Sequence, residues 1–152
     1  MNNEKTIDVL NTLIEINNDR IEGYETASKE TDNPDMKSLF NGFIQTSQQC
    51  KQQLVSEVVT LGGTPTEGTR TSGKFFRAWM DIKAAVTGKD REAILNSCEY
   101  GEDVAVETYS DVLKNEMEHI SPKQQSMINS QYVLIKADHD NVKELRDMLV
   151  EH

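Results

Sequence analysis

Four long segments of the chain repeat apolar residues at intervals of three and four, the spacing of one face of an α-helix. Signals for β-strands are almost absent from the sequence. A helix with a single apolar stripe cannot bury that stripe alone, so four stripes of similar length predict an all-α four-helix bundle. The predicted helices span about residues 6–29, 34–61, 90–116 and 122–150, with a shorter one at about 74–86.

The ends of these segments have local stop and start signals. Asn33 and Ser121 each stand before a proline, and a capping side chain followed by proline is typical of a helix start. Gly62 and Gly63 follow the second stripe, as expected of a helix end. The short links within each pair predict two antiparallel hairpins. The long segment between the hairpins predicts a crossover that runs the length of the bundle and contains the short fifth helix.

Length and charge limit the protein class. The chain has 152 residues, which predicts a single domain over residues 1–152. Its formal net charge of -10, without a local cluster of Lys and Arg, argues against nucleic acid and anionic membranes as partners. The sequence has neither a long apolar run nor a signal peptide, and Cys50 and Cys98 are its two cysteines. These features predict a cytoplasmic protein in a reducing compartment.

Each of the four apolar stripes is interrupted by a polar residue near its middle. The interrupting residues are Asn17, Ser47, Glu102 and His139. Buried polar groups are costly unless they have partners, so these four are predicted to meet in one polar chamber inside the bundle. Three more side chains are predicted to border it: Tyr24, Tyr109 and Lys136.

The layout resembles that of ferritin-like di-iron proteins of the bacterioferritin and rubrerythrin type. In that superfamily, helices one and three each provide a Glu, and helices two and four each provide a Glu-x-x-His motif. A Tyr often follows each lone Glu by seven residues, as Tyr24 and Tyr109 follow Asn17 and Glu102 here. The six positions that match the metal ligands hold Asn17, Ser47, Cys50, Glu102, Lys136 and His139.

A closer resemblance is to a small bacterial family of ferritin-like proteins whose function is unassigned, a domain of unknown function. The shared motifs are "LGG-x-P", "WMDIKAAVTG", "CEYGEDVA" and "IKADHD", and the similarity covers about residues 8 to 147. The resemblance implies the ferritin-like bundle and says little about chemistry.

The matching positions argue against a complete di-iron centre. Of the six, Glu102 and His139 keep the ligand types of the family, and two neighbouring dications need several carboxylates to balance their charge. The predicted function is therefore that of a non-catalytic protein with a degenerate di-iron site and no expected cofactor. Such a protein acts as an oligomer or as a partner-binding module.

The residues leave alternatives open. One is a mononuclear site for a single Zn or Fe ion, made by Cys50, Glu102 and His139, in a metal-binding protein or oxidoreductase. Another makes His139 an interior histidine bonded to Glu102 or to a backbone carbonyl. Lys136 either points inward to pair with Glu102 or extends into solvent.

The predicted connector helix has an aromatic face. Phe75, Phe76 and Trp79 gather on it. This face either packs against the side of the bundle or forms a homodimer, a higher homo-oligomer or a partner-binding surface.

Overall fold

The computed structural model describes residues 3–31, 33–68 and 91–150, and over these residues the fold is all-α with no β-strand. The predicted helical bundle is thus confirmed. The predicted connector helix at 74–86, with Phe75, Phe76 and Trp79, lies outside the described residues. The elements are α1 (Asn3–Glu30), α2 (Pro34–Thr60), α4 (Arg91–Asn115), the short 3-10 helix η1 (Met117–His119) and α5 (Pro122–Val150).

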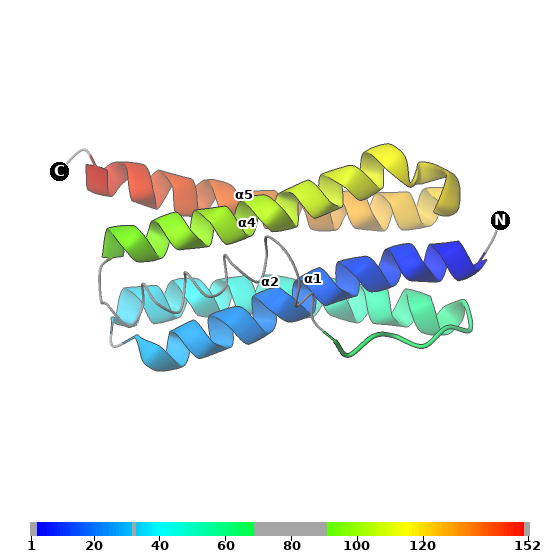
Figure 1. Ribbon diagram of the computed structural model, residues 1–152, viewed down its shortest axis with the longest axis horizontal. Helices are drawn as coiled ribbons and strands as arrows, with labels where there is room; N and C mark the ends of the chain where they lie inside the picture. The colour runs from blue at the N-terminus through cyan, green and yellow to red at the C-terminus, as the bar shows by residue number, and fades with distance from the viewer. Residues whose placement is uncertain (1–2, 32, 69–90, 151–152) are drawn as a thin grey trace.

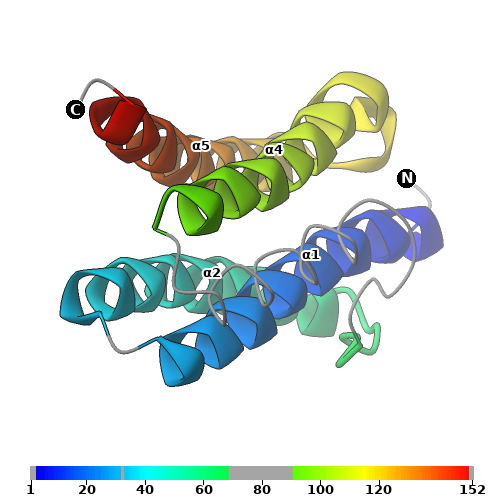
Figure 2. The same ribbon diagram turned by 60° about the vertical axis from the view of Figure 1, so that its left-hand side comes forward.

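The four long helices of the described residues form two hairpins that lie side by side (Figure 1). The helices α1 and α2 pack closely along each other, as do α4 and α5. Figures 1 and 2 show that α4 begins at the end of the bundle opposite to the end of α2, so α2 and α4 run in the same direction. None of the helices among the described residues has an apolar stretch long enough to cross a membrane.

Capping residues explain where the helices begin and end. Asn33 Oδ1 accepts hydrogen bonds from the backbone N–H groups of Asp35 and Met36 at the start of α2, at 2.9 and 3.2 Å. At its end, Gly62 adopts a left-handed φ of 84°, and its N–H donates to a carbonyl of the last turn.

The start of α5 is a capping box. Ser121 Oγ accepts from the backbone N–H of Gln124 at 3.1 Å, and Gln124 Oε1 accepts from the backbone N–H of Ser121 at 2.8 Å. Two backbone donors that have no intrahelical partner are satisfied in this reciprocal way.

The apolar core is divided into two clusters along the bundle axis. On α1, one cluster includes residues from Val9 to Ile16, and the other includes Tyr24 and Ala27. The same division recurs on α2, α4 and α5, where buried Ser47, buried Glu102 and partly exposed Asp138 lie between the two clusters. The bundle therefore has a polar layer across its middle.

Candidate functional site

Arg20 lies at the centre of this polar layer. Its side chain on α1 is 1% exposed and that of Glu102 on α4 is fully buried. Arg20 Nε and Nη2 both donate to Glu102 Oε1, at 3.2 and 2.8 Å, and Nη1 donates to Ser47 Oγ on α2 at 2.5 Å. Nη2 also donates to Asp138 Oδ2 on α5 at 3.1 Å. One guanidinium thus connects all four helices.

Aromatic rings enclose the guanidinium on its apolar side. The Arg20 guanidinium carbon is 5.9 Å from the ring centroids of both Tyr24 and Phe43, a distance suited to cation–π attraction. The Tyr24 hydroxyl donates to Glu102 Oε1 at 2.7 Å. Glu102 Oε1 therefore accepts hydrogen bonds from both Arg20 and Tyr24.

A neighbouring hydrogen-bond chain crosses the bundle through Tyr109. Asn17 Nδ2 donates to the Tyr109 hydroxyl at 2.8 Å, and this hydroxyl donates to Gln131 Oε1, also at 2.8 Å. Gln131 Nε2 then donates to the Cys50 carbonyl at 3.2 Å and to Gln53 Oε1 at 3.0 Å. The chain joins the same four helices as Arg20 does, so the polar layer fixes the register of the two hairpins.

In this layer, burial and neighbouring charges shift the pKa values of the side chains in opposite directions. Burial raises the pKa of Glu102, and the Arg20 charge opposes this without cancelling it. The pKa of Asp138 is raised in the same way. For Arg20, burial acts to lower the pKa, but the negative charges of Glu102 and Asp138 outweigh it and keep the guanidinium charged.

The two cysteines have the properties of buried apolar residues. Burial raises the pKa of the Cys50 thiol to about 11, and burial together with the Glu102 charge raises the pKa of Cys98 further. Both side chains are fully buried. A thiol reacts and binds metal as the thiolate, so neither is activated for nucleophilic or redox chemistry at neutral pH.

The interior polar layer does not fit a di-iron centre. Glu102 Oε2 and Asn17 Oδ1 are buried acceptors without a hydrogen-bond partner among the described residues. They provide at most one carboxylate and one neutral oxygen, whereas a pair of dications needs several carboxylates. The permanently charged Arg20 guanidinium lies beside the same carboxylate and repels any cation that approaches it.

Several residues that the sequence placed in the chamber lie in this layer. Asn17, Ser47 and Glu102 are fully buried there. The hydroxyls of Tyr24 and Tyr109 are bonded to Glu102 and Asn17.

Lys136 and His139 lie outside this layer: of the two orientations left open for Lys136, the structure has the one toward solvent, and the predicted inward placement of His139 is wrong. Lys136 is exposed on α5. His139 is 17% exposed, and its ring nitrogens contact Asp103 Oδ1 and Asp140 Oδ1 rather than Glu102. The inward face of α5 continues from Ile135 through Asp138, one position before the residue that the stripe predicted.

The physical reason is the period of the helix. A repeat of 3.6 residues lets steps of three or four follow the same face, so 131 and 138 compete with 132 and 139 for the inward positions. In the structure the inward positions are occupied by Gln131 and Asp138. Their side-chain oxygens accept hydrogen bonds from Tyr109 and Arg20, respectively. Tyr132 and His139 lie at the edge of that face.

Sequence reasoning also missed Arg20, the central residue. A usable signal existed, since Arg20 lies three residues after Asn17 and four before Tyr24, on the same helix face. A lone Glu102 on a buried stripe also needs a cationic partner.

Cys50, Glu102 and His139 are not gathered into a metal-ligand group. Among the described residues, the His, Cys, Asp and Glu side chains that do bring three ligand atoms within 4.8 Å of one another are Glu99, Asp103 and His139. His139 therefore belongs to a different cluster from Glu102.

The fold and the polar layer define a class of protein: an all-α four-helix bundle with a buried arginine–carboxylate centre. A family model described as "Domain of unknown function (DUF2383)" matches residues 5–115, well over half of the chain, so the chain belongs to this family. No curated protein matches it. The matched range includes α1, α2 and α4, and hence Arg20, Ser47 and Glu102, whereas α5 follows it.

Proposed function

We propose that this protein is a non-catalytic bundle of the ferritin-like type, in which the Arg20 guanidinium takes the place that metal ions hold in di-iron proteins. Its interior stabilises the fold, and the protein works through its surface as an oligomer or a partner-binding module. The observation that supports this most is the engagement of Arg20 with Glu102, Ser47 and Asp138 from the other three helices.

Electrostatics favours this proposal over an interior metal. A dication about 5 Å from the guanidinium would be repelled by roughly 7 kcal/mol at an effective dielectric constant of 20. That cost falls on a layer whose one fully buried carboxylate is already paired with Arg20.

Elemental analysis of the full chain, purified without chelator, tests the proposal against its metal-binding alternative. We expect Glu102→Gln and the parent protein to have the same metal content, because Glu102 binds Arg20 rather than an ion. Glu107→Gln, an exposed Glu on the same helix, is the matched control. A metal ion that is present in the parent protein and in the control but lost in Glu102→Gln would refute the proposal.

Sedimentation equilibrium tests the surface role. A monomer has a mass of 17.2 kDa, and we expect a larger mass that falls toward this value in Trp79→Ala while helicity by circular dichroism stays unchanged. Trp79, with Phe75 and Phe76, lies outside the described residues, so this part of the proposal rests on the sequence. A parent protein that is monomeric at every concentration would exclude self-association and leave partner binding.

A further inference from the structure

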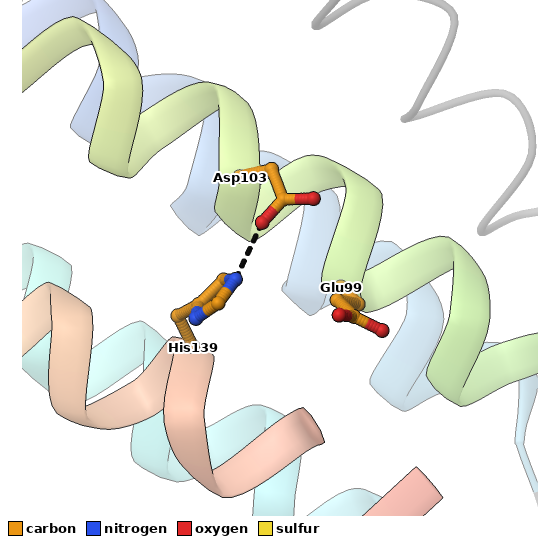
Figure 3. A group of neighbouring side chains, drawn as sticks. All are labelled: Glu99, Asp103 and His139. Atoms are coloured by element: carbon orange, nitrogen blue, oxygen red, sulfur yellow. Dashed lines mark hydrogen bonds and ion pairs between the residues drawn. The ribbon is translucent and has the colours of Figure 1, made fainter.

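A second group of polar side chains lies outside the buried layer, on the surface where α4 packs against α5. Glu99 and Asp103 are one turn apart on α4, and His139 projects from α5 beside them (Figure 3). One ring nitrogen and two carboxylate oxygens from these residues lie within 4.8 Å of one another. We call this group the α4–α5 seam cluster.

The seam cluster has the ligand types that a divalent transition metal requires. Zn²⁺ takes imidazole nitrogen and carboxylate oxygen at about 2.0–2.2 Å, and tetrahedral ligands at that radius are about 3.4 Å apart. No two ligand atoms therefore have to approach by more than about 1.4 Å, whereas His139 Nε2 and Asp103 Oδ1, which are in direct contact, have to move apart to admit the ion. Asp103 is 57% exposed and is free of packing constraints on that scale. We propose that the seam cluster binds one divalent transition-metal ion of the Zn²⁺ type through Glu99, Asp103 and His139.

The imidazole distinguishes this cluster from an ordinary acidic patch. His139 Nδ1 lies 3.2 Å from Asp140 Oδ1, and His139 Nε2 contacts Asp103 Oδ1. When Asp140 accepts the Nδ1–H, the Nε2 lone pair faces the Asp103 carboxylate, so a proton or a metal ion has to lie between them. A carboxylate that holds the second ring nitrogen of a ligand histidine is the usual support of such sites.

The surrounding charge and the position of the site favour cation binding. The chain has a formal net charge of -10, which raises the local concentration of cations. Unlike the interior layer, where Arg20 repels cations, the seam cluster combines two carboxylates with one imidazole. An ion bound there joins α4 to α5, and the proposal is independent of the function proposed for the interior.

Titration calorimetry of the chelator-free full chain with ZnCl₂ tests the site. We expect one saturable site, with affinity lowered at least about 10-fold in His139→Ala and in Asp103→Asn. The matched controls are His119→Ala and Asp111→Asn, which should leave the affinity unchanged. His119 is an informative control because Glu116 and Glu118 lie 3.7 and 3.3 Å from its Nε2, yet these three side chains do not bring their ligand atoms within 4.8 Å of one another.

The supporting carboxylate gives a second, graded test. Asp140→Asn retains all three ligands, and we expect it to weaken Zn²⁺ binding by about 10- to 100-fold. Zn²⁺ should also raise the midpoint of thermal unfolding of the parent protein and not that of His139→Ala.

Two results would overturn the proposal. One is the absence of saturable Zn²⁺ binding to the parent protein. The other is equal binding by the parent protein, His139→Ala and Asp103→Asn, which would indicate diffuse attraction to the acidic surface. Glu102→Gln separates the two proposals, because loss of metal in that variant would refute the arginine-filled interior, whereas loss in His139→Ala alone supports the seam site.

Discussion

Replacement of Arg20 by methionine is the most direct test of the buried centre. Methionine keeps much of the side-chain length and removes the donors that reach Glu102, Ser47 and Asp138. The Glu102 carboxylate then stays buried with the Tyr24 hydroxyl as its remaining donor among these partners. Removal of one partner of a buried ion pair typically costs about 3–5 kcal/mol of folding stability.

The loss of folding stability in Arg20→Met should depend on pH. Without Arg20, the cheapest state of buried Glu102 is the protonated one, and protonation of a carboxyl with an ordinary pKa near 4.3 costs about 4 kcal/mol at pH 7 and about 1 kcal/mol at pH 5. The stability deficit of Arg20→Met should therefore shrink as the pH falls. For a chain of this length, 4 kcal/mol corresponds to a drop of roughly 8–16 °C in the unfolding midpoint.

These losses of folding free energy can be measured by chemical denaturation at pH 5 and pH 7. The proteins compared are the parent protein, Arg20→Met, Glu102→Gln and the double variant. The double variant should regain part of the loss at pH 7, because it leaves no unpaired charge on Glu102. Lys136→Met, which removes an exposed cation, is the control and should stay within about 0.5 kcal/mol. An Arg20→Met deficit below 0.5 kcal/mol at pH 7, or one equal at both pH values, would refute the reasoning.

Three further predictions concern titration, capping and thiol reactivity. Because the pKa values of Glu102 and Asp138 are raised by folding, the folded state binds more protons than the unfolded state above about pH 4, so their contribution to stability should fall as the pH rises toward neutrality. In denaturation experiments across that pH range, the folding stability of Asp138→Asn should fall less steeply with rising pH than that of the parent protein. An unchanged slope would contradict a raised pKa of Asp138. Asn33→Ala removes the side-chain acceptor for two N–H groups at the start of α2 and should cost about 1 kcal/mol by thermal denaturation, with no loss arguing against the cap. Cys50 and Cys98 should react with a thiol reagent at pH 8 only as fast as the protein unfolds, because both are buried with raised pKa values; immediate modification of the folded protein would disprove this.

Local chemistry determined the helices. Apolar spacing, the Asn33 and Ser121 caps and the Gly62 stop depend on neighbours within a few residues, so they predict the elements directly from sequence. The same periodicity placed Asn17, Ser47 and Glu102 on inward faces, where the structure has them.

Tertiary packing decided which polar side chains meet. Along α5 the helical period of 3.6 residues makes positions 138 and 139 nearly equivalent candidates for the inward face. Asp138 takes the inward position, where its carboxylate accepts a hydrogen bond from the Arg20 guanidinium. His139 consequently lies in the seam with Asp103, far along the chain but adjacent in space. Arg20 itself was missed because charged residues are rarely buried, and one becomes stable inside only when partners from the other helices surround it. Those partners come together only when the two hairpins pack.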